Sequence, residues 1–497
     1  MYLLLNQNTT PTELGAINPN TTVLQWLRKN NLVGTKEGCA AGDCGACTAV
    51  VGELITRNNK QAIQYKSINT CIALASSMIG KHLVTVEGLV EGENLHPVQQ
   101  AMVTENGSQC GFCTPGFVMS LFAMYHSEDK LNITKINEGL SGNLCRCTGY
   151  KPIIAAAFSS INEKANNPAD YYTKNQTKIK QTLVRLNKAQ NVSLSYNNNG
   201  NTIHYDAPTS LKDLAKVLGN NPQATILAGG TDLNLEITQS TRQFSHIINI
   251  SQVQELNAIK DEKSKIEIGS AVTYQDASSS LIKYWPELEG FLYRFASLPI
   301  KNWATIGGNI ANASPIGDMP PVLIALEAKL KLRKKSAIRS VKLEDFFIGY
   351  KKTALAEGEF IEIITIPKPA IEGRLIAHKI SKRYEDDISA VCMAMNVCLQ
   401  DSKPKSLRVA FGGMSGIPQR AKKLEQVLLD YWNKEELVQK SYSALKEEFS
   451  PLSDVRASAE YRLQVSANLV KKSVLGIKGE ALANLAETSN ESFYMEA

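Results

Sequence analysis

The distribution of cysteine is the feature that most restricts how this chain can fold. Eight of its ten cysteines lie between Cys39 and Cys147, and only Cys392 and Cys398 lie beyond them. In a chain of 497 residues without a recognisable secretion signal, clustered cysteines bind metal more often than they form disulfides. The N-terminal third is therefore expected to fold around metal sites.

The first cysteine group consists of Cys39, Cys44, Cys47 and the remote Cys71. The spacing C-x4-C-x2-C with a distant fourth thiol is the plant-type [2Fe–2S] pattern. Four thiolates must converge on two irons, and the glycines within residues 38–47 allow the backbone to approach the sulfur atoms closely. Structural zinc is the alternative, although zinc sites usually show paired C-x2–4-C motifs.

The second cysteine group consists of Cys110 and Cys113, followed across a predicted helical hairpin by Cys145 and Cys147. Taken alone, this pattern also fits a thioredoxin-like redox dithiol at Cys110 and Cys113. The second pair favours a metal site with four thiolates. Two such clusters in one chain would form a path for electrons.

The remaining patterns predict a multidomain α+β protein. Residues 1–82 are predicted as a small α+β domain, and residues 83–163 show helical spacing of apolar residues. Residues 164–201 are polar and rich in Asn, Lys and Gln, which predicts a linker and the main domain boundary. Residues 202–384 are predicted as a mixed α/β domain, and residues 385–497 as a C-terminal α+β domain.

Two glycine-containing loops in the α/β region could hold a polar ligand. The turn at residues 227–232 follows a predicted strand and could offer N–H groups to a diphosphate. It is neither G-x-G-x-x-G nor a P-loop, so a plain connection is the alternative. Residues 304–318 combine small residues with Asn, Ser and Asp, which suits a ligand loop or a tight turn satisfied by its own side chains.

Charge and hydropathy exclude several classes of protein. The net charge is +6, but 54 basic and 48 acidic residues are spread along the chain and no nucleic-acid-binding motif is present. The N-terminus lacks the cationic start and apolar run of a signal peptide, and no apolar stretch of about twenty residues follows. We expect a soluble cytoplasmic protein that contacts neither nucleic acid nor membrane.

Residues 38–47, 109–116 and 142–150 together resemble the iron–sulfur portion of the xanthine dehydrogenase family of molybdenum hydroxylases. The resemblance implies a ferredoxin-like β-grasp domain followed by a four-helix domain, each binding one [2Fe–2S] cluster. It also implies the following ligands, whose positions all match the family pattern: Cys39, Cys44, Cys47 and Cys71 for one cluster, and Cys110, Cys113, Cys145 and Cys147 for the other.

The two glycine-containing loops also resemble the FAD-binding stretches of this family, which implies an α/β FAD-binding domain. The implied contacts are Leu227, Ala228, Gly229, Gly230, Thr231, Asp232, Leu233 and Asn234 for the diphosphate, Phe295 against the isoalloxazine, Ala304, Thr305, Gly308, Asn309, Asn312 and Asp318 along the cofactor, and Lys379 near its ring system. Residues 383–387 match a loop near the flavin and nicotinamide sites, with an exposed acidic turn as the alternative.

In this family the substrate reacts at a molybdopterin cofactor held by a large separate portion, so a molybdopterin-binding partner subunit is expected. The order of the iron–sulfur and flavin units resembles the small subunit of two-component bacterial xanthine dehydrogenases. A heterotetramer of two small and two large subunits would fit this resemblance. Related carbon monoxide dehydrogenases and hydroxybenzoyl-CoA reductases usually carry the two units on separate chains.

The resemblance implies an electron-transfer function without a catalytic residue for the substrate on this chain. Electrons would pass from molybdenum through the helical-domain cluster, the N-terminal cluster and FAD to NAD, while hypoxanthine and xanthine are oxidised to urate. NAD as acceptor, rather than oxygen, rests on the family alone. The alternatives are a molybdenum hydroxylase for another N-heterocycle or an aldehyde, a stand-alone diaphorase, and a zinc-bearing scaffold.

Overall fold

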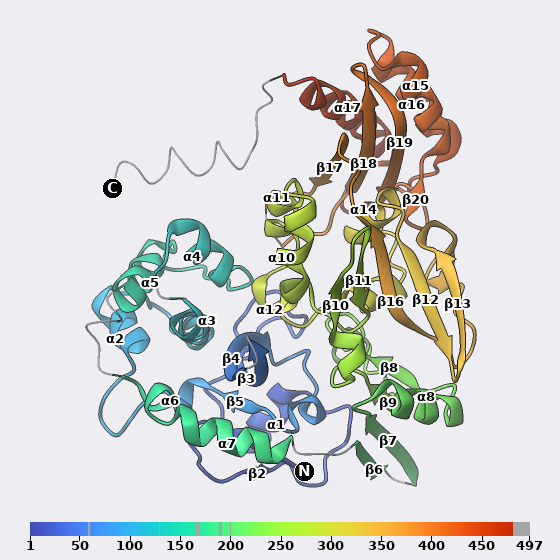
Figure 1. Cartoon of the computed structure of the whole chain (residues 1–497). Coiled ribbons are helices and arrows are strands. Elements are labelled where there is room, and N and C mark those ends of the chain that lie inside the picture. Colours follow the sequence, from blue (N-terminus) through green and yellow to red (C-terminus); the bar gives the residue numbers. More distant parts are fainter. Residues whose placement is uncertain are drawn as a thin grey trace. The chain divides into compact units, whose positions relative to one another are not determined.

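The computed structural model describes residues 1–57, 60–128, 130–162, 164, 169–187, 191–198, 200–384 and 386–480 (Figure 1). These residues form two compact units. The first unit contains Met1–Glu255, Thr273–Gln275 and Ala296–Thr305. The second unit contains Leu256–Val272 and Asp276–Phe295 and continues from Ile306.

The first unit begins with a five-stranded mixed sheet in the order β2-β1-β5-β3-β4. Its strands are β1 (Tyr2–Leu5), β2 (Thr12–Glu13), β3 (Thr48–Arg57), β4 (Lys60–Asn69) and β5 (His82–Val84). Strand β1 pairs parallel to β5, and β3 pairs antiparallel to both β4 and β5. Helix α1 (Val23–Lys29) starts with a capping box at Thr22 and buries Val23, Trp26 and Leu27 in the core of this domain.

Helices follow this sheet, as the sequence predicts. They are α2 (Pro97–Thr104), α3 (Thr114–Ser127), α4 (Ile133–Leu140) and α5 (Lys151–Asn162), which lie together in Figure 1. Residues 116–125 of α3 are all buried, so α3 is the central helix of the group. The core formed by α3 and its neighbours continues into the sheet through Val50 and Tyr65.

The predicted linker, residues 164–201, contains regular structure and is not an extended connection. It holds α6 (Tyr171–Lys174), α7 (Gln176–Leu186), β6 (Val192–Asn198) and the first residue of β7. Ile179 and Leu183 are one helical turn apart on α7 and are buried in the same core as α3. The polar composition obscured this narrow apolar stripe. Residues 165–168, 188–190 and 199 of the predicted linker lie outside the described part.

The first unit ends with a four-stranded sheet in the order β6-β7-β9-β8. Strand β6 forms a hairpin with β7 (Asn201–Ala207), and β7 and β8 (Thr225–Leu227) both pair parallel to β9 (His246–Asn249). The helices here are α8 (Leu211–Asn220), α9 (Leu235–Thr238) and α12 (Leu298–Lys301). The predicted FAD-binding domain, residues 202–384, therefore contains parts of both units.

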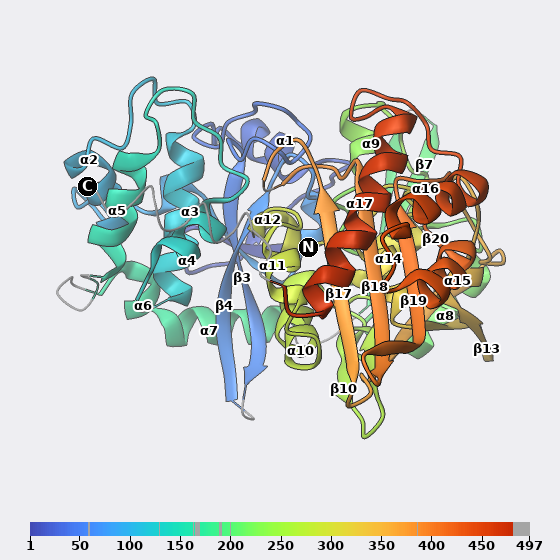
Figure 2. The same cartoon turned by 90° about the horizontal axis from the view of Figure 1, so that it is seen from above.

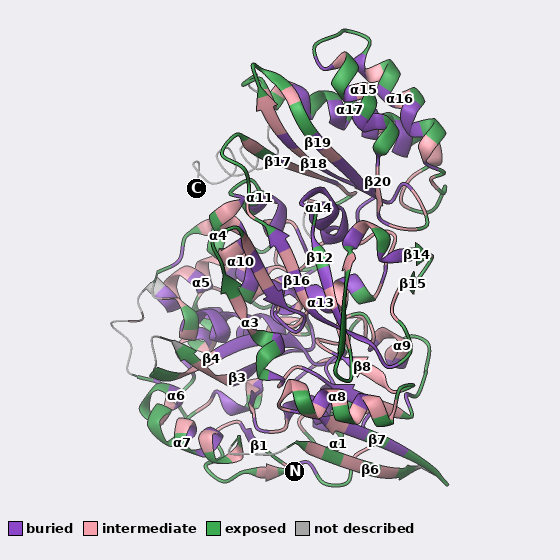
Figure 3. Cartoon of the chain, turned by 45° about the vertical axis from the view of Figure 1, so that its right-hand side comes forward, coloured by how far each residue is buried: buried purple, intermediate pink, exposed green. Residues whose placement is uncertain are grey.

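The second unit contains an antiparallel sheet in the order β10-β11-β16-β12-β13. The strands are β10 (Ile259–Asp261), β11 (Lys265–Gly269), β12 (Lys329–Lys334), β13 (Ala337–Lys342) and β16 (Phe360–Pro367), and a short pair is formed by β14 (Phe347–Gly349) and β15 (Lys352–Thr353). The helices are α10 (Tyr274–Tyr284), whose first two residues belong to the first unit, α11 (Leu288–Tyr293), α13 (Ile306–Ala311) and α14 (Met319–Ala325). All seven residues of α14 are buried, as its purple ribbon in Figure 3 shows.

A second sheet, in the order β17-β18-β19-β20, closes the second unit. It consists of β17 (Gly373–Ile380), β18 (Val391–Gln400), β19 (Lys403–Gly412) and β20 (Gln419–Arg420), and α15 (Lys422–Tyr431), α16 (Leu437–Glu448) and α17 (Ala459–Ile477) lie against it (Figure 2). Val391, Met393 and Met395 alternate along β18 and pack with these helices. Cys392 points to the other face and donates from its thiol to the Asp318 carbonyl oxygen at 3.3 Å.

The predicted multidomain α+β fold is confirmed. Among the described residues, no helix combines the length and the apolar composition needed to cross a membrane.

Candidate functional site

The first cysteine group is brought together by the loop before β3 and the turn after β4. The sulfur atoms of Cys47 and Cys71 are 3.3 Å apart and buried, whereas Cys39 and Cys44 are half-buried. Backbone N–H groups of Ala41, Asp43 and Cys44 point at the Cys39 sulfur over 3.3–3.4 Å. These amides would stabilise negative charge on the sulfur.

The four thiols of this group also interact with one another. Hydrogen bonds from the Cys44 and Cys71 thiols, with those from the amides, hold the pKa of Cys39 well below its usual range. The hydrogen bond to Cys39 raises the pKa of Cys71. The four sulfur atoms therefore form one contiguous donor set, as a four-thiolate cluster requires.

Glycine is needed where the cluster loop passes close to its neighbours. A Cβ atom on Gly38 would lie 2.7 Å from the Cys44 sulfur. Gly45 has a φ of +68°, and a Cβ there would lie 2.2 Å from the Gly142 carbonyl oxygen. The loop can follow this path only with glycine at these two positions. The thiol set and its close backbone therefore fit a [2Fe–2S] cluster.

The second cysteine group lies at the N-terminus of α3 and in the loop before α5. Its thiols interact as two pairs, Cys113 with Cys145 and Cys110 with Cys147. Cys145 is buried, Cys113 is half-buried, and Cys110 and Cys147 are exposed. All four predicted thiols are thus in one place, and one edge of the group reaches the surface.

The Cys145 sulfur accepts several hydrogen bonds. The N–H groups of Cys147 and Thr148 lie 3.4 Å away, and the Thr148 hydroxyl lies 3.2 Å away. Burial raises the pKa of the Cys145 thiol, but these donors outweigh it and lower the pKa to about 7. A sulfur in this setting is suited to act as a thiolate ligand.

The predicted diphosphate loop in the first unit joins β8 to α9. A Cβ on Gly229 would lie 1.7 Å from the Trp303 carbonyl oxygen, and Gly230 has a φ of +74°. Asn234 is 1% exposed and donates from Nδ2 to the Ile72 carbonyl oxygen at 2.8 Å. Its Oδ1 has no hydrogen-bond partner among the described residues. A tight glycine loop beside an unpaired buried acceptor fits a polar ligand such as FAD.

This loop lies beside the first cysteine group. Ile72, which accepts the Asn234 bond, directly follows Cys71. Leu235 of α9 packs with Cys47 and Cys71. Two further predicted residues of the first unit, Ala304 and Thr305, follow α12, where the Ala304 carbonyl accepts from Tyr274 N–H at 2.9 Å.

The other predicted FAD residues lie in the second unit. Gly308, Asn309 and Asn312 are partly exposed along and just after α13, Phe295 is 8% exposed after α11, and Asp318 precedes α14. Lys379 is buried on β17, and its ammonium group contacts Asp318 Oδ2 at 2.5 Å, the Ser389 hydroxyl at 3.1 Å and the Asp387 carbonyl oxygen.

These contacts use all three hydrogen-bond donors of Lys379. Asp318 Oδ1 has no partner among the described residues. Lys379 therefore holds Asp318 in place, and Asp318 offers the unpaired acceptor. Within the second unit, this unpaired buried acceptor fits a hydrogen-bonding ligand such as FAD.

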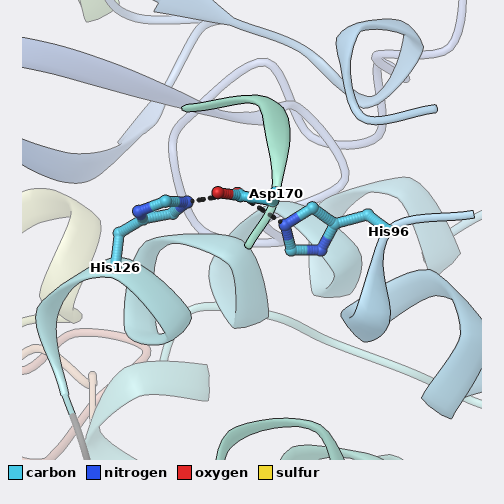
Figure 4. A group of neighbouring side chains, drawn as sticks. All are labelled: His96, His126 and Asp170. Carbon is cyan, nitrogen blue, oxygen red and sulfur yellow. Dashed lines mark hydrogen bonds and ion pairs between the residues drawn. The ribbon is translucent and has the colours of Figure 1, made fainter. Parts of the chain in front are cut away.

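Sequence reasoning did not find the group formed by His96, His126 and Asp170 (Figure 4). Both histidine Nε2 atoms donate to Asp170 Oδ2, at 2.9 and 2.8 Å. His96 Nδ1 accepts from Val98 N–H, so its proton resides on Nε2, which cannot then ligate a metal. Burial opposes ionisation of Asp170, but the histidine hydrogen bonds outweigh it and lower its pKa.

This group connects the start of α2, the end of α3 and the N-cap of α6. It therefore holds the N-terminus of α6 against α2 and α3. No local signal marks it, because Asp170 is 74 residues from His96 and 44 residues from His126.

Four families of known domains match consecutive parts of the chain. A 2Fe-2S iron-sulfur cluster binding domain matches residues 5–76, and a [2Fe-2S] binding domain matches residues 85–158. An FAD binding domain in molybdopterin dehydrogenase matches residues 201–369, and a CO dehydrogenase flavoprotein C-terminal domain matches residues 376–477.

Several known proteins are similar to this chain over most of these domains. Xanthine dehydrogenase of Emericella nidulans is 31% identical over 85% of the chain, and xanthine dehydrogenase/oxidase of Rattus norvegicus is 32% identical over 86%. The chain spans about a third of the length of these curated relatives, 34% and 35%. A solved carbon monoxide dehydrogenase from Hydrogenophaga pseudoflava, which lacks the Mo-pyranopterin moiety, is 28% identical with a TM-score of 0.51, covering 54% of this chain and 94% of that one.

The fold, the two thiol groups and the matched domains define an iron–sulfur flavoprotein whose cofactors are two [2Fe–2S] clusters and FAD. The chain belongs to the molybdenum hydroxylase family and is similar to its xanthine dehydrogenase members. Its cofactors transfer electrons.

Proposed function

We propose that this chain is the electron-transfer subunit of a xanthine dehydrogenase. It takes electrons from a molybdopterin cofactor on a partner subunit and passes them to NAD while hypoxanthine and xanthine are oxidised to urate. The similarity to xanthine dehydrogenases over 85% of the chain supports the reaction class. The difference in burial between the two cysteine groups is the observation that supports the proposed direction of electron transfer.

Entry of electrons is assigned to the second cysteine group. Cys110 and Cys147 are exposed, and the apolar side chains beside these cysteines, Phe112, Leu144 and Tyr150, are 49%, 43% and 37% exposed. An exposed apolar surface around a redox centre fits a protein partner that brings its own centre close. This surface is the proposed docking site of the molybdopterin-binding subunit.

Exit of electrons is assigned to the first cysteine group and the loop beside it. Cys47 and Cys71 are only 1% and 3% exposed, and the residue after Cys71 bonds to Asn234 of the predicted diphosphate loop. Bound FAD accepts single electrons and can deliver a hydride, which suits NAD as acceptor. We therefore propose that electrons pass through the first cysteine group on their way from the entry site to the flavin.

The predicted site residues are assigned in the same way. The cluster ligands are Cys39, Cys44, Cys47 and Cys71 for the first group, and Cys110, Cys113, Cys145 and Cys147 for the second. FAD contacts are residues 227–234, Ala304 and Thr305 in the first unit, and Phe295, Gly308, Asn309, Asn312, Asp318 and Lys379 in the second. A heterotetramer with two partner subunits and a cytoplasmic location complete the proposal.

Purification of the tagged full chain from its native source tests this proposal. We expect about four iron atoms and one FAD per chain, with a stoichiometric molybdenum-bearing partner. The complex should reduce NAD when xanthine is added. NADH oxidation by a chain that captures no molybdenum would overturn the proposal and favour a diaphorase. Turnover of an aldehyde or another N-heterocycle, with none of xanthine, would replace the substrate and leave the electron path intact.

A further inference from the structure

The loops that carry the two cysteine groups touch through a backbone hydrogen bond. The Leu144 N–H donates to the Cys44 carbonyl oxygen at 3.0 Å. Leu144 directly precedes Cys145 of the second group, and Cys44 belongs to the first group. One non-covalent contact therefore links a thiol of one group to a thiol of the other.

We propose that this hydrogen bond is the path by which an electron crosses from the second cluster to the first, and that Asn143 is the positioning residue that maintains it. The inference rests on the proposed function for the direction of transfer. The second cluster loses one electron and the first cluster gains it. The bond stays intact, and no proton or other reactant is needed.

Apart from that contact, the path is covalent. From the Cys145 sulfur it follows the Cys145 side chain and the peptide bond to Leu144, whose N–H contacts the Cys44 carbonyl. It then follows the Cys44 backbone and side chain to the Cys44 sulfur. Electronic coupling decays less steeply along covalent and hydrogen bonds than across a gap between packed atoms, so this path favours transfer.

Asn143 fixes the position of this contact. The side chain is 5% exposed, and Nδ2 donates to the Gly45 carbonyl oxygen at 3.2 Å and to the Thr48 hydroxyl at 3.3 Å. Its Oδ1 accepts from the Ser120 hydroxyl on α3 at 2.6 Å. One amide side chain thus holds residues on both sides of the contact, next to Cys44 and next to Leu144.

The surrounding backbone segments lie close together, with glycine at the points of approach. A Cβ on Gly116 would lie 2.2 Å from the Gly45 carbonyl oxygen, and a Cβ on Gly45 would lie 2.2 Å from the Gly142 carbonyl oxygen. Three segments therefore meet at this point, and glycine leaves room for the Asn143 amide beside them. This close approach lies within three residues of Cys44, Cys113 and Cys145, where short-range transfer between the clusters requires it.

The experiment uses the full chain with both clusters and FAD bound. A photochemically generated one-electron reductant delivers electrons to the exposed second cluster, and bleaching of the flavin band reports their arrival beyond the first. Asn143→Ala is compared with Asn20→Ala. Asn20 is also a buried asparagine, 2% exposed, but it bonds to Phe244 and not to the second cysteine group.

Asn143→Ala is expected to slow bleaching about tenfold or more, within the range that outer-shell changes produce at metal sites. Asn20→Ala should keep the wild-type rate. Cluster potentials, measured by EPR titration, should stay unchanged in both, which separates lost coupling from lost driving force. A wild-type rate in an Asn143→Ala chain that retains about four irons would overturn the proposal.

A further variant tests the hydrogen bond itself. Leu144→Pro removes the N–H group. Transfer should slow in this variant, and the spin–spin coupling between the reduced clusters should weaken with it. If Leu144→Pro loses iron, the spin–spin coupling between the reduced clusters is measured in Asn143→Ala instead. An unchanged coupling in that variant would refute the path. Missing molybdenum in the native complex would refute the proposed function without affecting this result.

Discussion

The two cysteine groups each supply four thiols, but their surroundings differ. In the first group Cys47 and Cys71 are almost fully buried, and a predicted FAD loop lies beside it. The second group has Cys110 and Cys147 at the surface, among exposed apolar side chains. In the proposed electron path, the first group is the interior relay and the second is the entry point. Burial, and not the ligand type, distinguishes these two proposed roles.

The largest expected effect is a loss of stability when the loop of the first cysteine group is changed. Gly45→Ala places a residue with a side chain at a φ of +68° and a Cβ 2.2 Å from a carbonyl oxygen. Backbone strain and the clash together should lower the free energy of unfolding by about 3 kcal/mol or more. Iron content and urea unfolding would measure this.

Gly149→Ala is the matched control in the second group. Gly149 has a φ of +67°, but a Cβ there meets nothing within 4 Å. Only the backbone cost of about 1 kcal/mol should appear. Equal losses of iron in the two variants would contradict the view that the first group is the more tightly packed.

Acid should destabilise the N-terminal sheet that contains β5. Burial lowers the pKa of His82 on β5 to about 4, and its Nε2 contacts the Asn6 carbonyl oxygen at 2.7 Å. The unfolded chain binds this proton below about pH 6.5, whereas the folded chain binds it only near pH 4. Stability is therefore fully present above pH 6.5 and falls by about 3 kcal/mol towards pH 4.

Urea unfolding at several pH values would show this slope. His82→Gln should flatten it, whereas His204→Gln, at an exposed position, should not change it. An unchanged slope in His82→Gln would mean that other groups cause the acid sensitivity.

Partner binding should depend on the surface around the second group. Phe112→Asp places a charge on an apolar side chain that is 49% exposed between Cys110 and Cys113. Binding of the molybdenum-bearing subunit should weaken about tenfold, as expected for an interface anchor. Titration calorimetry or co-purification would measure it. Ile371→Asp, at a residue that is 99% exposed in the second unit, should leave binding unchanged.

The smallest effect is kinetic. An iron chelator should remove iron in two phases, severalfold faster from the second group, because exposed ligands are accessible without opening the fold. EPR during the reaction would show which cluster signal disappears first. Earlier loss of the buried cluster would reverse the assignment of the interior and entry positions.

The sequence predicted what depends on local spacing. The patterns at Cys39–Cys47 and Cys110–Cys113 identified both thiol groups, and the structure brings each set together. It also predicted the helices around α3. In these cases the informative residues are neighbours in the chain.

Contacts between distant segments left no such signal. Asn143 is 98 residues from Gly45, and no pattern next to either residue indicates that they form a hydrogen bond. Ile179 and Leu183 are too few apolar positions to mark α7 against its polar background. For Lys379, the family resemblance indicated a place near the flavin, but only the fold shows that its three donors are used by its own neighbours.

The contact of Gly45 with Gly116 and Asn143 has a consequence for recombination. The N-terminal domain with the first cysteine group and the helical domain with the second follow each other in sequence. From the sequence alone, each could be exchanged separately between relatives. Because Gly45, Gly116 and Asn143 meet across the two domains, a chimera joined between them must inherit these three residues as a set. The two domains would therefore have to be transferred together between relatives.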